Sequence, residues 1–328
     1  MPTLKKTVAI LLFVSAIIVI FLSSCSHYFN QGEIQKVGML VENPIHEQAW
    51  TKRGYEGLLD ISEKFDVEVY YKEGIQSDQE IANAVDEFVN DGVNLIFGHS
   101  NTYGKTFMDI SQFYPDVHFV YFNGGYFSDN VTSLNFNAHA MGFFGGMVAG
   151  EMTNTNEVGL IAAYEWQPEV EGFYEGVKYQ NPSANVHMDF IRDWNDQDTA
   201  LDVYDDMRRD TVDVFYPAGD AFSQQVIQRA NEDSAYAIGF VTDQSHIDQS
   251  TVLTSTIQHV DKLYTLTAER FDNNELKGSI LTFDFQDEVI SLGEYSSEVP
   301  ESFQRVLDDS IETYIETELL PNELENNR

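Results

Sequence analysis

The side chains best suited to bind a ligand are aromatic rings that follow predicted strands. Trp50 comes after the first strand and its loop, and Phe173 and Trp194 occupy comparable places in the second half of the chain. Ligands of doubly wound α/β folds bind beyond the carboxyl ends of parallel strands, so one flat ring from each half could clamp a planar molecule. A structural role for Trp50 is an equal alternative, because it shares a helical stripe with Leu58 and Ile61.

Two segments that contain glycine have structural as well as ligand-binding interpretations. Asn123-Gly124-Gly125 follows the fourth predicted strand, where a ligand contact and an ordinary turn are equally supported. Glycines also crowd residues 141–150, yet Met141 and Phe144 keep helical spacing there. That spacing favours close packing of helices over a phosphate-binding loop.

The sequence contains none of the common catalytic signatures. It has no phosphate-binding P-loop, no Gly-x-Ser-x-Gly, no His-Glu-x-x-His and no Gly-x-Gly-x-x-Gly. The 8 histidines are scattered without the spacing of metal ligands, and Asp193, Asp196 and Asp198 are expected to form a solvated loop. We therefore predict a protein that is not an enzyme and that uses neither a metal nor a cofactor.

The charge of the chain restricts its partners. Asp and Glu number 54 against 18 Lys and Arg, which gives a formal net charge of -36. Because DNA and anionic membrane surfaces repel such a protein, we expect no direct binding to nucleic acid. The balance suits a protein that faces a salty or alkaline exterior. With Cys25 as the single cysteine, neither an intramolecular disulfide nor a cysteine-rich zinc site can form.

The amino terminus has the features of an export signal. Lys5 and Lys6 precede an apolar run over residues 7–22, which is shorter than the roughly 20 residues of an untilted membrane span. A short membrane anchor is the alternative. Leu22-Ser-Ser-Cys25 resembles the lipobox of bacterial lipoproteins, in which diacylglycerol is attached to the thiol and cleavage leaves the cysteine first. We predict a signal peptide over 1–24, lipidation of Cys25 with palmitate-type chains, and a tether over 25–33.

Behind this leader, strands alternate with helices in two series, which is typical of parallel sheets covered by helices on both faces. The predicted strands span residues 37–41, 67–71, 93–97 and 118–122 in the first series and 157–162, 186–191, 212–216 and 236–240 in the second. Residues 281–285 and 289–292 flank a polar turn and predict a hairpin. A closing helix is expected from the spacing of Phe303, Leu307 and Tyr314. The pattern predicts an α/β protein with two doubly wound lobes.

Several stretches together are similar to the basic membrane lipoprotein family of nucleoside-binding lipoproteins, and within it to a Bacillus branch of competence regulators. They are Val37-Gly-Met-Leu-Val, Gly54-Tyr-Glu-Gly-Leu-Leu, Val93-Asn-Leu-Ile-Phe-Gly-His, Asn130-Val-Thr-Ser, Met141-Gly-Phe-Phe-Gly-Gly-Met, Trp166-Gln-Pro-Glu-Val, Tyr216-Pro-Ala-Gly-Asp, Tyr236-Ala-Ile-Gly-Phe-Val-Thr-Asp-Gln and Val252-Leu-Thr-Ser-Thr. The resemblance implies a type 1 periplasmic-binding-protein fold with two Rossmann-like lobes, three crossovers and a hinge cleft. The lobes are expected over 34–137 plus about 243–280 and over 138–242 plus about 281–320.

The resemblance also implies which residues contact the ligand. In nucleoside-binding members, rings from both lobes sandwich the base, and an acidic residue holds the ribose hydroxyls. Trp50 falls near the first ring, Phe173 matches the second, and Asp243 in Val-Thr-Asp-Gln matches the acid. Stacking of a base on an aromatic ring contributes about 1–3 kcal/mol per ring. A carboxylate can accept hydrogen bonds from two vicinal hydroxyls.

The chain departs from the family pattern at three places, which leaves the identity of the ligand open. The usual Gly-Gly-x-Asp-Asp-x-Ser-Phe-Asn segment is replaced by residues 42–51, a usual lysine is Gln258, and a usual aspartate is Asn123. Two functions are therefore compatible with the sequence. The first is a lipid-anchored extracytoplasmic binding protein for a small, nucleoside-like ligand, served by an ABC permease. The alternative is a positive regulator of competence gene transcription that acts indirectly from the membrane.

Overall fold

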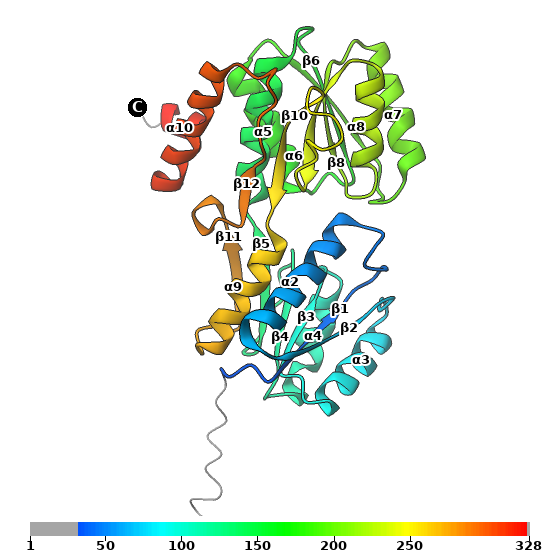
Figure 1. Cartoon of the computed structure of the whole chain (residues 1–328), viewed down its shortest axis with the longest axis vertical. Helices are drawn as coiled ribbons and strands as arrows, with labels where there is room; N and C mark the ends of the chain where they lie inside the picture. The colour runs from blue at the N-terminus through cyan, green and yellow to red at the C-terminus, as the bar shows by residue number, and fades with distance from the viewer. Residues whose placement is uncertain (1–31, 327–328) are drawn as a thin grey trace, which may run out of the picture.

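The computed structural model describes residues 32–326 and contains two six-stranded sheets, each in its own lobe (Figure 1). The predicted signal peptide, Cys25 and most of the tether lie outside the described residues. The eight strands predicted from alternation are all present, each within two residues of its expected bounds. The α/β class and the two doubly wound lobes are therefore confirmed.

The first lobe has the strand order β11-β5-β4-β3-β1-β2, with all of these strands parallel. Its strands are β1 (Lys36–Leu40), β2 (Glu68–Lys72), β3 (Leu95–Gly98), β4 (His118–Phe122), β5 (Val131–Phe136) and β11 (Ile280–Phe283). Its helices are α2 (Ala49–Phe65), α3 (Asp78–Asn90), α4 (Tyr103–Ile110) with the short η1 (Ser111–Phe113), and α9 (Val260–Asp272). Every residue of β3 and β4 is buried, as expected for central strands of a parallel sheet.

The second lobe repeats this plan with the order β12-β10-β9-β8-β6-β7, in which only the edge strand β12 runs antiparallel. Its strands are β6 (Glu157–Ala162), β7 (Asn185–Phe190), β8 (Val214–Ala218), β9 (Tyr236–Val241), β10 (Val252–Gln258) and β12 (Ile290–Leu292). Its helices are α5 (Ala138–Met152), α6 (Pro168–Gln180), α7 (Gln197–Arg209), α8 (Ser223–Glu232), α10 (Glu301–Thr317) and α11 (Pro321–Asn326), with η2 (Phe285–Asp287) before β12.

The glycine-rich segment forms part of α5, and its glycines allow α5 and α6 to pack closely. A methyl group at Gly146 would lie 2.2 Å from the carbonyl oxygen of Phe173, and one at Gly142 would lie 2.4 Å from that of Glu169. On the facing helix, a methyl group at Gly176 would lie 1.9 Å from the carbonyl oxygen of Phe143. Any larger residue would push the helices apart. The prediction of helix packing in this segment is confirmed.

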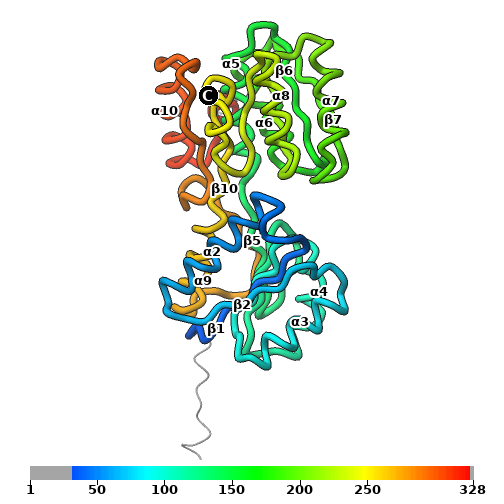
Figure 2. The backbone as a smooth tube through the Cα atoms, turned by 45° about the vertical axis from the view of Figure 1, so that its right-hand side comes forward, coloured from blue at the N-terminus to red at the C-terminus, as the bar shows by residue number. Residues whose placement is uncertain are grey.

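Two features at the carboxyl end differ from the expectations. The predicted hairpin is wrong, because β11 pairs with β5 in the first sheet while β12 pairs with β10 in the second. Strand β10 lies in the second sheet, although the expected bounds assigned residues from about 243 to the first lobe. Helix α9 then returns to the first lobe and packs on α2, as Figure 2 also shows. Local patterns identify strands, whereas the choice of sheet depends on pairing with distant strands.

Three crossovers join the lobes, and hydrogen bonds tie them together. Asn137, between β5 and α5, donates from Nδ2 to the Asp284 carboxylate over 2.6 Å. The Tyr314 hydroxyl of α10 also donates to this carboxylate. The His259 amide, between β10 and α9, donates to the Val289 carbonyl over 2.8 Å. A bending motion of the lobes would therefore involve all three crossovers together.

No helix within residues 32–326 is both long and apolar enough to cross a membrane.

Candidate ligand-binding site

The aromatic ring of Trp50 lies in the second position of α2, at the junction of the lobes. It stacks on the His99 ring with 4.9 Å between centroids, and its edges meet Phe122 and Phe136 at 5.6 and 5.9 Å. Its Nε1 donates to the His99 carbonyl over 3.1 Å. The side chain is only half-buried, so it is held by the first lobe and still reaches solvent. Both interpretations of Trp50, packing and ligand contact, fit this position.

His99 holds the Trp50 ring in place through stacking and hydrogen bonds. Its Nε2 lies 2.9 Å from the Trp50 carbonyl, and its Nδ1 lies 2.8 Å from the Tyr264 hydroxyl. A carbonyl can only accept, so Nε2 carries the proton and Nδ1 accepts from the tyrosine. Burial lowers the pKa of His99 to about 4, which keeps the ring neutral at pH 7. Gly54 leaves space for this ring, because a methyl group there would lie 2.3 Å from it.

The start of α2 also contacts the second lobe. The Trp50 amide donates to both carboxylate oxygens of Asp220, at 3.3 and 3.4 Å, and Asp220 follows β8 in the second lobe. Gln48 donates from Nε2 to Oδ1 of Asn195 over 2.7 Å. Burial raises the pKa of Asp220 to about 6, although the amides of Trp50 and Ala49 oppose the shift by donating to the carboxylate. In this structure the carboxyl ends of the two sheets therefore face each other in contact.

Trp194 lies in the second lobe beside these contacts, in a group of three aromatic rings. Its ring centroid lies 5.4 Å from that of Tyr164 and 6.1 Å from that of Trp166. Tyr164 and Trp166 stack on each other at 5.3 Å, and Trp166 is 58% exposed. The carbonyl of Trp194 accepts from the Ala221 amide over 3.2 Å, which places this group next to Asp220.

A buried polar network holds the loop that carries Tyr164 and Trp166. Gln167 accepts at Oε1 from the Tyr164 amide over 2.7 Å and donates from Nε2 to the Ala218 carbonyl over 3.0 Å. The same Nε2 donates to Glu169 over 2.8 Å. Burial raises the pKa of the Glu169 carboxyl. The loop after β6 is thus tied to the end of β8, from which Asp220 projects.

Phe173 does not lie at the junction of the lobes. Its ring is fully buried and stacks on Tyr216 of β8 with 4.7 Å between centroids, inside the second lobe. The backbone carbonyl of the same residue faces Gly146 of α5. In this state Phe173 belongs to the core between α5, α6 and the sheet, and the rings of the second lobe that reach the junction are those around Trp194.

The three polar candidates are dispersed. Asn123 is exposed after β4 and has a left-handed backbone with φ 56°. Asp243, after β9, is half-buried and accepts from the Ser245 amide over 2.9 Å. Gln258 is buried at the end of β10, where a crossover begins. Asn123 and Asp243 lie just beyond the carboxyl ends of β4 and β9, whereas Gln258 is the last residue of β10, and no hydrogen bond among the three is formed.

Sequence reasoning missed four residues of the junction, namely Tyr164, Trp166, His99 and Asp220. All four follow the carboxyl end of β6, β3 or β8 within four residues. The rule used for Asn123, that ligands bind beyond such strand ends, would have selected them as well. The rule does not rank these four residues above the many other acidic and aromatic residues of the chain.

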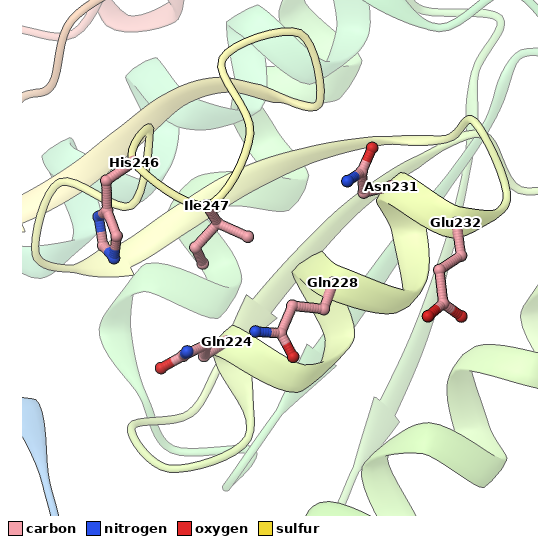
Figure 3. Close-up of a pocket in the computed structure, with 6 residues that line it drawn as sticks. All are labelled: Gln224, Gln228, Asn231, Glu232, His246 and Ile247. Carbon is pink, nitrogen blue, oxygen red and sulfur yellow. The ribbon is translucent and has the colours of Figure 1, made fainter.

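A separate polar pocket lies on the second lobe between α8 and the loop after β9 (Figure 3). Gln224, Gln228, Asn231 and Glu232 line it from α8, and His246 and Ile247 line it from the loop. None of the predicted ligand-binding residues contributes to it. Within residues 32–326 no group of three or more His, Cys, Asp or Glu side chains is arranged to hold a metal ion.

Two lobes of parallel sheets, three crossovers and aromatic rings at the junction define a periplasmic-binding-protein type of solute-binding fold. A solute-binding protein of an ABC transporter system from Conexibacter woesei has this fold, with a TM-score of 0.72 and 18% identity over 88% of this chain and 99% of its own. Residues 34–323 match the family Bmp, described as ABC transporter substrate-binding protein PnrA-like. The chain therefore belongs to the Bmp family.

Two relatives are much more similar. The transcriptional activator protein med of Bacillus subtilis is 44% identical over 93% of this chain and 96% of its own length. A crystal structure described as a transcriptional activator of the comK gene from Bacillus halodurans is 46% identical, with a TM-score of 0.83 over 87% of this chain and 99% of that one. The predicted membership of the family is confirmed, and its fold is that of substrate-binding proteins rather than of enzymes.

Proposed function

We propose that the protein is a lipid-anchored, extracytoplasmic binding protein that holds a small, nucleoside-like ligand between its lobes. The observation that carries this proposal is the Trp50 ring, which is fixed by His99 at the lobe junction and half-exposed there. Trp194 and Trp166 supply rings on the facing lobe. A planar base would stack on these rings, and Asp243 would accept hydrogen bonds from ribose hydroxyls.

The proposal is tested by thermal unfolding of residues 26–328, refolded to remove bound ligand, against nucleosides, bases and sugars. A ligand at one hundred times its dissociation constant stabilises a protein by about 2.7 kcal/mol, which is a shift of a few degrees. A shift confined to nucleosides supports the proposal. No shift across the panel would contradict it and favour the second function below.

The anchor is a separate part of the proposal. Cys25 would be lipidated and retain the protein at the outer face of the cell membrane, where an ABC permease would be its partner. Replacing Cys25 with Ser should abolish lipidation, so radiolabelled palmitate should label the wild type alone. Labelling of the variant would contradict the anchor.

The second function is regulation of competence gene transcription from the membrane. The specific observation in its favour is the 44% identity, over nearly the full length of both chains, to a protein named as a transcriptional activator. Because the protein has a net charge of -36, direct contact with DNA is disfavoured, and its effect on transcription would be indirect. Deleting the gene and measuring competence transcription and ligand uptake separates the two functions. Unchanged transcription with lost uptake would exclude the regulator.

A further inference from the structure

Helix α2 begins without a cap from its own lobe. Its N-cap residue Gln48 makes no side-chain capping bond, and the first turn contains no acidic residue. Helix α3 differs, because Ser77 and Glu80 form a complete capping box. Helix α7 is capped by Asp196. Helices α4, α5, α6, α8, α9 and α10 resemble α2 in having no side-chain cap of their own. The free amides at the start of a helix bind anionic oxygens, so those of α2 can donate to an acceptor from elsewhere.

The second lobe supplies that acceptor. Asp220 lies two residues beyond β8, and its carboxylate accepts from the Trp50 and Ala49 amides of α2. The bond from Gln48 to Asn195 adds a second connection over 2.7 Å beside it. These connections join the carboxyl edges of the two sheets on the side where the lobes meet. In Figure 1 the start of α2 lies at the top of the first lobe, directly below the second.

We propose that Asp220 and the Gln48–Asn195 pair form a latch that closes the lobes without a bound ligand. Asp220 acts as a cap of α2 that is present only in the closed state, so opening the lobes exposes the amides of Ala49 and Trp50. A cap of ordinary strength shifts the ratio of closed to open molecules about five-fold. The latch goes beyond ligand binding, since it sets the resting state of the free protein.

The latch also has a consequence for ligand charge. A ligand carboxylate or phosphate would compete with Asp220 for the same amides and would face its negative charge at short range. Closure on Asp220 therefore favours ligands that are neutral at the α2 end of the junction.

The test measures the distance between the lobes in ligand-free protein by double electron–electron resonance. The full chain with Cys25→Ser, in detergent, contains no native thiol, so spin labels attach only at Asn90→Cys and Asp202→Cys. Both positions are exposed, on α3 and α7, and Figure 1 shows these helices on one side of the molecule, away from the crossovers. Opening at the crossovers would lengthen this distance.

Four further changes are compared in this background. Asp220→Ala removes the acceptor, Asp220→Asn keeps an uncharged acceptor in the same place, and Gln48→Ala removes the second connection. Asp206→Ala is the matched control, because it removes an exposed acid of the same lobe that forms an ion pair with Arg209 on its own helix. Circular dichroism checks that each variant is folded. If Asp220→Ala does not fold, Gln48→Ala alone tests the latch.

If the latch exists, the ligand-free parent, Asp220→Asn and Asp206→Ala should all show the distance between spin labels that corresponds to closed lobes. The latch also predicts that Asp220→Ala raises the open fraction at least several-fold and that Gln48→Ala raises it as well. A parent that is already open, or folded Asp220→Ala and Gln48→Ala variants with the distances of the parent, would overturn it. Because no ligand is added, failure of the latch leaves the thermal-shift test of the proposed function unaffected.

Discussion

Trp50 and Phe173 show how two aromatic residues with the same predicted role can be separated by burial. Trp50 packs against three rings of the first lobe and keeps part of its surface free at the junction. Phe173 has no exposed surface and packs on Tyr216. Sequence spacing placed both residues near strand ends, but it gave no direction for their side chains. Which way a ring points depends on the neighbouring helix, here the close α5–α6 packing around Phe173.

Replacing Phe173 with Ala should lower the free energy of unfolding by about 3–5 kcal/mol, because it removes a fully buried ring and leaves a cavity. Tyr174→Ala is the matched control: its side chain is 41% exposed, and the change expected there is within about 0.5 kcal/mol. Urea unfolding of both variants checks this. A Phe173→Ala variant as stable as the wild type would show that the ring is not part of the core.

Buried histidines make the first lobe sensitive to acid. Burial lowers the pKa of His99 and of His118 to about 4, while the unfolded chain takes up these protons near pH 6.5. The unfolded state therefore binds more protons between these values, and stability falls as the pH decreases through them. The expected loss is on the order of 3 kcal/mol per histidine at pH 4. His99→Gln should show a shallower fall in urea unfolding between pH 7 and 4 than the wild type.

Asp220 has the opposite effect on how stability changes with pH. Its pKa in the folded protein is raised to about 6 from 3.8, so its contribution to stability becomes more favourable as the pH falls through 6. Asp220→Asn removes this compensation and should steepen the acid-induced loss. Equal slopes for the wild type, His99→Gln and Asp220→Asn would contradict the assignment of these shifts.

At the scale of elements, the contact between α5 and α6 depends on glycine. Gly146→Ala would place a methyl group 2.2 Å from the Phe173 carbonyl and should destabilise the protein, although Ala favours a helix over Gly by about 1 kcal/mol. Gly145→Ala meets only Thr256 and Ile238 side chains, at 3.2 and 3.5 Å, and should be close to neutral. Thermal midpoints of the two variants test the comparison. A Gly146→Ala variant more stable than Gly145→Ala would contradict the packing described.

Most strands and helices could be predicted, because each has a local signature of apolar runs or helical spacing. Strands β5 and β10 were not. Strand β5 follows β4 through residues 123–130, and β10 follows β9 through residues 242–251, without a helix between them, so both break the alternation. The segment around η2 resembled a hairpin because its polar turn joins two short apolar runs. In the structure these runs enter different sheets, and this pairing is decided by β5 and β10, which lie far away in the sequence.

At the scale of the whole molecule, the function depends on contacts between lobes that no local pattern contains. Asp220 is one of 54 acidic residues, and its partner amides lie 170 positions earlier in the chain. The junction brings this carboxylate, Trp50 and the Trp194 group together only after both sheets have formed. The crossovers, tied by Asn137, Asp284 and Tyr314, are the places where closure would be absorbed.

Calorimetric titration tests whether Trp50 forms one wall of a ligand site between the lobes. Refolded wild-type protein and Trp50→Ala are titrated with each nucleoside that raises the thermal midpoint. We expect one site per chain in the wild type and a loss of about 1–3 kcal/mol of binding free energy in a folded Trp50→Ala variant, because one stacked ring is removed. Equal affinity in both proteins, or no binding of any nucleoside to the wild type, would contradict this expectation.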